Sequence, residues 1–211
     1  MMRKLLILIS ALGCISASPA FAQTTYNKGE IHGGGGPGFN QSTTSDFANT
    51  SYHFIGGGGY NFSESIGATG EYMYYHLSIK EQPGLTDRSG HLGGYIGNVM
   101  FRTTSKLGFY GIFGAGYYKR SVNSGQSTAL PAGSPCPAVL VWWNVPCSGG
   151  VTTTAATVDH QSDWAWGINV GGGVNFPLKG RLKGYSDVRF HNIYNEHVST
   201  RILPWTFGVR W

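Results

Sequence analysis

Apolar and polar residues alternate along much of this chain, and the pattern is clearest in its last twelve residues, Thr200 to Trp211. Successive side chains of a β-strand point to opposite sides, so residues two apart share a face. From residue 203 onward, one face of this segment is apolar without a break and ends in an aromatic residue; its members are Leu203, Trp205, Phe207, Val209 and Trp211. The pattern predicts a strand with one side in an apolar environment.

Seven further segments alternate in the same way and are bounded by residues typical of turns. The eight predicted strands are Lys28–Phe39, Tyr52–Phe62, Ile66–Ser78, Gly90–Arg102, Leu107–Arg120, Trp164–Phe176, Leu182–Tyr194 and Thr200–Trp211. Each has about 10 to 14 residues, which is the length of a tilted strand that crosses a lipid bilayer.

The connections between these strands alternate in length. The tight ones are 63–65, 103–106 and 177–181, the long ones are 40–51, 79–89 and 121–163, and 195–199 is shorter but polar. An even number of strands places both termini at the short-turn end. Barrels of the outer membrane have this asymmetry, with short periplasmic turns and longer outer loops.

The two faces of the predicted strands differ in polarity. In the sixth strand, one face carries Trp164, Trp166, Ile168, Val170, Val174 and Phe176, and the other carries only alanine, glycine and asparagine. In the seventh, Val188, Phe190 and Tyr194 lie opposite Lys183, Asp187, Arg189 and His191. A soluble barrel of the lipocalin type would have its apolar side chains inside. We therefore predict an all-β, eight-stranded, antiparallel, up-and-down transmembrane β-barrel.

The inward faces carry a set of charged side chains: Glu71, Arg102, Asp187, Arg189 and Arg210. The interior of an eight-stranded barrel is just wide enough for side chains to fill it. Because an isolated charge shielded from water is very costly, these groups should form ion pairs. The sequence thus predicts a polar network that largely plugs the lumen, with a narrow conduit as the alternative.

The first 22 residues have the features of a cleaved signal peptide. Arg3 and Lys4 precede an apolar run that is too short to span a membrane, and Ala20-Phe21-Ala22 is a small-x-small cleavage site. Cleavage would leave residues 23–211 as one barrel domain. A lipoprotein reading at Cys14 is the weaker alternative, because the preceding residues match a lipobox only in part.

Composition excludes some classes of function. Without Arg3 and Lys4 the chain has 13 basic and 10 acidic residues. A net charge of +3 gives no reason to expect nucleic-acid binding. The glycine runs at 33–36, 56–59 and 171–173 could be taken for phosphate-binding loops, but no predicted helix follows them. We expect no cofactor and no metal.

Two cysteines of the exported domain, Cys136 and Cys147, lie in the long connection 121–163. Cysteine pairs of exported proteins tend to oxidise, so a disulfide is expected. Between them lie Val139, Leu140, Val141, Trp142 and Trp143. Such a run suits either a contact surface for another protein, lipopolysaccharide or a neighbouring cell, or a hairpin that packs on the barrel rim.

Several segments resemble eight-stranded outer-membrane β-barrel domains of the small OmpA/OmpX-like porin group. They are 67–75, 97–101, 109–118, 171–191 and 203–211, and the resemblance covers nearly all of the domain. It implies insertion in the bacterial outer membrane as a monomer, among lipid and lipopolysaccharide. It also implies that the barrel-assembly machinery reads the terminal face from Leu203 to Trp211.

The function suggested by these patterns is a structural or surface-interaction role without catalysis. A narrow low-conductance pore, a lipid A-modifying enzyme and a soluble periplasmic ligand-binding barrel are the alternatives. The enzyme alternative has two weak motifs. One begins at His191 but has Ile193 where a nucleophilic serine would stand, and the other is His76 with Ser78.

Overall fold

The computed structural model describes residues 28–80, 85–104, 108–126, 159–195 and 199–211. These residues form eight strands and one short helix, α2 (Thr43–Phe47). The strands are β1 (Gly29–Asn40), β2 (Ser51–Asn61), β3 (Ile66–Ser78), β4 (Leu85–Arg102), β5 (Gly108–Gln126), β6 (Asp159–Lys179), β7 (Leu182–Ile193) and β8 (Thr200–Arg210).

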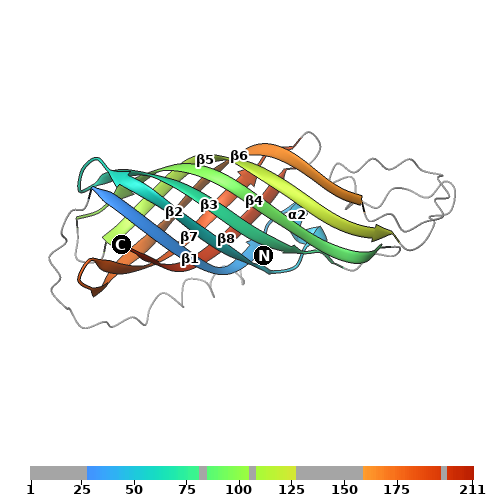
Figure 1. Ribbon diagram of the computed structural model, residues 1–211, viewed down its shortest axis with the longest axis horizontal. Helices are drawn as coiled ribbons and strands as arrows, with labels where there is room; N and C mark the ends of the chain where they lie inside the picture. Colours follow the sequence, from blue (N-terminus) through green and yellow to red (C-terminus); the bar gives the residue numbers. More distant parts are fainter. Residues whose placement is uncertain (1–27, 81–84, 105–107, 127–158, 196–198) are drawn as a thin grey trace.

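The strands form one closed barrel in which each pairs antiparallel with its neighbours along the chain (Figure 1). β8 closes the barrel against β1, where Phe207 pairs with Gly35 and Arg210 pairs with His32. The predicted fold class is confirmed. The predicted bounds of β3 agree with the structure, and those of β1, β2, β7 and β8 differ by one residue at one or both ends.

Three strands extend beyond their predicted ends. β4 begins at Leu85, β5 continues to Gln126 and β6 begins at Asp159, so the predicted connection 121–163 is too wide at both ends. The backbone ladder between β5 and β6 continues through Ser121 and Ser162 to Ser124 and Asp159. Backbone hydrogen bonding between strands does not require apolar and polar residues to alternate. The sequences of the outer ends of β5 and β6 are polar and do not alternate, so the period-two pattern did not predict them.

Helix α2 lies in the predicted connection 40–51 and was not predicted. It packs over the end of the barrel that carries the long connections, here called the long-loop end. Thr44 and Ala48 are buried, the Thr44 Oγ1 accepts a hydrogen bond of 2.9 Å from the Arg201 N–H, and Ala48 forms a β-bridge with Ile79. No helix in the described parts of the chain is long and apolar enough to span a membrane.

The outer surface of the barrel is apolar and its interior is mostly polar, as the alternation predicts. Trp166 of β6 and Val170 are 56% and 53% exposed, whereas Asn169 between them is buried. The larger outward side chains include Ile31, Phe54, Tyr60, Phe62, Tyr72, Tyr95, Phe101, Phe109, Phe113, Tyr117 and Phe207. Such an exterior belongs to a barrel whose solvent is the hydrocarbon of a bilayer.

Candidate functional site in the barrel lumen

Three charged side chains from β3 and β7 meet at the centre of the lumen. The Arg189 guanidinium donates to Glu71 Oε2 at 2.5 Å and, from two of its nitrogens, to Asp187 Oδ2 at 2.9 and 3.2 Å. The three side chains are at most 1% exposed. Two carboxylates on one guanidinium form a compact arrangement whose hydrogen bonds are charge-assisted.

Neighbouring polar groups complete the hydrogen bonding of the two carboxylates. Glu71 also lies 2.9 Å from His32 Nε2, and it accepts hydrogen bonds from Asn98 Nδ2 at 2.9 Å and from Thr69 Oγ1 at 3.3 Å. The Tyr110 hydroxyl donates to Asp187 Oδ2 at 2.7 Å. Since these partners come from β1, β3, β4 and β5, the hydrogen bonds connect strands from several sides of the lumen.

A second charged layer lies near the short-turn end of the barrel. Arg102 donates to Glu30 Oε2 at 2.6 Å, and Arg210 Nε lies 3.5 Å from Glu30 Oε1. The Arg210 guanidinium also lies between the rings of Tyr110 and Tyr185, 5.1 and 5.0 Å from their centroids. Of the five charged residues selected from the sequence, the structure thus brings Glu71, Asp187 and Arg189 together, and groups Arg102 with Arg210 around Glu30.

Glu30 was missed by the sequence analysis, although it is the acidic partner of both arginines in this layer. Its carboxylate also accepts a hydrogen bond of 3.2 Å from Asn61 Nδ2. The signal that could have found it is strand parity, because Glu30 and His32 alternate with the outward Ile31.

The half of the lumen nearer the long-loop end contains an apolar layer, with the buried Arg120 bound to Thr200 and Asp163 at its outer side. This apolar layer consists of Ala48, Ile55, Met73, Tyr75, Leu77, Leu92, Ile96, Tyr118, Ala165, Ile193 and Ile202. Its members come from β2 to β8 and from the residue after α2, and they are at most 6% exposed. The sequence analysis did not identify this layer. Next to Ile202 and Ala165 both faces of the strand are apolar, and next to Leu77 and Leu92 an apolar inward residue alternates with polar outward ones, which is the reverse of the pattern used to assign the faces.

Two buried histidines lie between the central ion pairs and the apolar layer. His53 Nε2 is 3.0 Å from the Thr206 hydroxyl, and His191 Nδ1 is 2.9 Å from the Tyr118 hydroxyl. His191 therefore faces the lumen, and Ile193 belongs to the apolar layer. Among the described residues, no group of three or more His, Cys, Asp and Glu side chains could hold a metal ion.

The remaining sequence candidates lie elsewhere. Leu203, Trp205, Phe207, Val209 and Trp211 share the outward face of β8 and the residue after it. The backbone of Trp211 exchanges two hydrogen bonds of 2.9 Å with Ile31. Cys136, Cys147 and the run from Val139 to Trp143 lie outside the described residues.

Comparison with solved structures finds other barrels at low sequence identity. The Neisserial surface protein A superposes with a TM-score of 0.59 and 13% identity, over 87% of this chain and 96% of that one. A major outer membrane protein from Thermus thermophilus gives 0.53 and 10%, over 87% and 97%. These similarities concern the fold alone. None of the curated proteins compared with the chain matches it.

The family comparison covers nearly the whole sequence. Residues 7–210 match the model of the outer membrane protein beta-barrel domain. The apolar exterior, the closed eight-stranded topology and the charged interior described above are consistent with this match. The chain belongs to the family of outer membrane protein β-barrel domains.

Proposed function

We propose that this protein is a bacterial outer-membrane barrel with a closed lumen, whose role is structural or is exercised by its outer loops. In this proposal residues 1–22 are removed on export, and the monomeric barrel is inserted with its long-loop end outside. The order of short and long connections supports this orientation.

The observation that carries the proposal is the division of the lumen into layers that oppose ion passage for different reasons. The charged groups around Arg189 and Glu30 are bound to each other, so an ion would have to compete with buried partners. In the apolar layer around Leu77 and Leu92 the side-chain polar groups are the hydroxyls of Tyr75 and Tyr118, which are already bound to Asn40 and His191 and so do not replace the hydration of an ion. A hydrophobic constriction of this kind closes a pore by excluding water.

Planar-bilayer recording tests the closed lumen directly. The wild-type barrel should insert without producing current steps. The variant Glu71→Ala/Leu92→Ala/Asp187→Ala/Arg189→Ala, which removes the central ion pairs and weakens the apolar layer, should produce them. The outward substitution Val188→Ala is the matched control and should stay silent. Steady current steps from the wild-type protein would refute the closed lumen and favour the narrow pore.

The proposal includes no catalytic step. The imidazole of His191 is bound to Tyr118 inside the lumen, and Ile193 has no hydroxyl to act as a nucleophile. His76 faces outward and its ring stacks on that of Tyr52 at a centroid distance of 4.8 Å. Release of fatty acid from lipid A that is lost in His76→Ala or His191→Ala would overturn this part of the proposal.

The loop between β5 and β6 is the part through which we propose that another molecule is contacted. Val139 to Trp143 would form the contact surface, and a disulfide between Cys136 and Cys147 would hold it. An external partner captured by the wild-type protein, but not by a variant with Trp142 and Trp143 replaced by serine, would support this role. Equal capture by both proteins would refute it.

A further inference from the structure

The aromatic belts at the two ends of the barrel differ in chemistry. Near the short-turn end, the outward rings are mostly phenylalanine: Phe62, Phe101, Phe109 and Phe176, with Tyr60 and Trp211. Nearer the long-loop end, most carry a polar group: Tyr52, Tyr74, His76, His91, Tyr117, Trp164, Trp166 and Tyr194. Rings with an apolar body and a polar tip suit a boundary that offers hydrogen-bonding partners.

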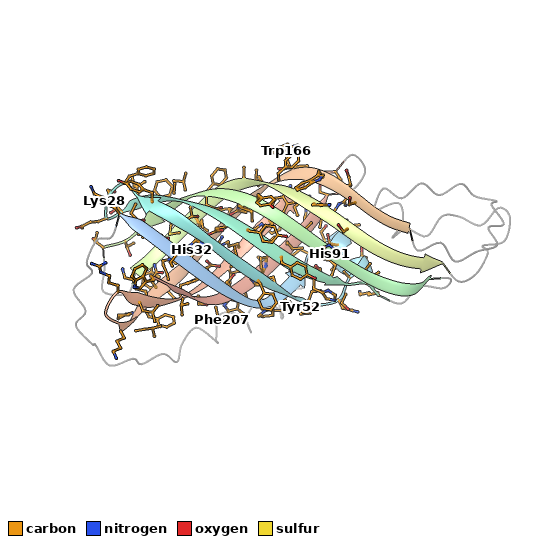
Figure 2. The ribbon with its side chains drawn as sticks, viewed as in Figure 1. Lys28, His32, Tyr52, His91, Trp166 and Phe207 are labelled. Atoms are coloured by element: carbon orange, nitrogen blue, oxygen red, sulfur yellow. The ribbon has the colours of Figure 1, made fainter. Side chains whose placement is uncertain are left out.

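On β5 to β7 these rings form a stacked surface. Trp166 pairs with Tyr117 of β5 in the strand register, and its ring stacks on that of Tyr194 at a centroid distance of 4.4 Å. Trp164 stacks on Tyr117 at 5.5 Å. Trp164 and Trp166 are 44% and 56% exposed, so part of each indole ring remains accessible beside its stacked neighbour. Figure 2 shows that Trp166 and Tyr52 project from opposite edges of the barrel.

One cation, Lys119, lies beside the two indoles, and a second, Arg201, lies on β8 opposite Asn192, two residues before Tyr194. Lys119 pairs with Trp164 in the register, and its ammonium lies 6.0 Å from the centre of the indole ring. Arg201 of β8 is exposed, and its Nε donates to the side-chain oxygen of Asn192 at 3.1 Å. The nearby carboxylate of Asp163 lies 3.4 Å from a nitrogen of the inward Arg120.

The opposite side of the barrel provides an internal comparison. On β2 to β4 the corresponding rings belong to Tyr52, Tyr74, His76 and His91. Among the side chains described on these three strands, no lysine or arginine faces outward. The nearest cation on this side, Lys80 after the end of β3, donates to the Ser45 carbonyl at 2.7 Å, whereas on the β5–β8 side the Lys119 ammonium lies over an indole ring.

We propose that the surface formed by Tyr117, Lys119, Trp164, Trp166, Tyr194 and Arg201 binds the phosphorylated saccharide headgroup of an outer-leaflet glycolipid. The C–H faces of a sugar ring pack on aromatic rings whose polar tips can bond its hydroxyls. Lys119 and Arg201 would bind phosphate through charge-assisted hydrogen bonds. A phospholipid headgroup could use the cations but has no sugar ring for the indoles. The inference rests on the proposed function, because it requires the long-loop end to face outward.

The test uses the full exported barrel, folded in detergent, with lipid A as the probe. Bound lipid A is quantified after gel filtration for the wild type, for Lys119→Gln/Arg201→Gln and for Trp164→Leu/Trp166→Leu. Each double variant should bind about tenfold more weakly, the change expected from a loss of about 1.4 kcal/mol. Lys28→Gln/Lys179→Gln, at the short-turn end, is the matched control and should bind like the wild type.

Two further probes separate the parts of the site. Dephosphorylated lipid A should bind more weakly than lipid A to the wild type, and equally well to the wild type and to Lys119→Gln/Arg201→Gln. Phosphatidylglycerol should bind alike to the wild type and to Trp164→Leu/Trp166→Leu. The proposal is overturned if the wild type binds lipid A and phosphatidylglycerol equally well. It is also overturned if Lys119→Gln/Arg201→Gln binds lipid A no more weakly than the control Lys28→Gln/Lys179→Gln.

Folding is checked on the same samples by the change in gel mobility on boiling. A variant that keeps this change but loses lipid A supports the site. A wild-type barrel that folds in the membrane but has no preference for lipid A refutes the inference and leaves the proposed function standing. A wild-type protein that does not fold into a membrane at all refutes both.

Discussion

Removing the cation at the centre of the lumen should be among the most damaging single substitutions in the barrel. Arg189→Met leaves Glu71 and Asp187 buried with no cation between them, and both carboxylates have no exposed area. Deleting one partner of a buried ion pair costs about 3 to 5 kcal/mol, because the remaining charge is uncompensated. We expect the free energy of unfolding to fall by this amount, a change of more than about a hundredfold in the folding equilibrium.

Neutralising the carboxylates as well should restore most of the loss. In Glu71→Gln/Asp187→Asn/Arg189→Met, the two amides still accept hydrogen bonds from Asn98 and Tyr110. Replacing a whole buried ion-pair group is often nearly neutral, so the triple variant should be more stable than Arg189→Met by at least about 2 kcal/mol.

Urea titration of the folded barrels in lipid vesicles, followed by tryptophan fluorescence, measures these differences. Arg181→Met is the matched control, because Arg181 is exposed in the turn between β6 and β7. A surface change of this kind should alter stability by less than about 0.5 kcal/mol. If Arg189→Met behaves like Arg181→Met, or if the triple variant is no more stable than the single one, the central ion pairs do not stabilise the barrel in this way.

Three smaller predictions follow from other parts of the chain. A Cβ on Gly171 would lie 2.8 Å from the Cα of Arg189, so Gly171→Ala should destabilise by about 1 to 3 kcal/mol in the same titration, whereas Gly70→Ala, with no atom within 4 Å, should not. Trp211→Asp should reduce the amount of folded barrel in cell membranes, seen on unboiled gels, while the purified variant still folds in detergent. Cys136 and Cys147 should resist a maleimide until a reductant is added, and labelling without reductant would refute the disulfide.

Strand parity predicted much of the interior, because a period of two fixes which side chains share a face. It placed Glu71, Asp187 and Arg189 on inward positions, but it could not give their distances, which depend on the register across several strands. Strand parity did not predict the apolar layer of the lumen. Ile202 is inward beside the outward Leu203, so the two faces of β8 show no contrast there.

Two features of the fold lie outside the reach of this pattern for different reasons. Helix α2 has five residues, too few to show a helical period, and tertiary contacts such as that between Arg201 and Thr44 hold it in place. The polar ends of β5 and β6 lie beyond the apolar belt, so selection for alternating faces no longer applies, although the backbone ladder continues. Backbone hydrogen bonding leaves little trace in sequence.

Membrane fractionation followed by gel electrophoresis will show whether this chain folds as a closed barrel within the outer membrane. The protein should be recovered with the outer membrane and released only by detergent. Its unboiled form should migrate differently from its boiled form, because a closed ladder of strands resists SDS until heated. Recovery from washed membranes without detergent, or the same mobility before and after boiling, would mean that the chain is not a closed barrel inserted in the membrane.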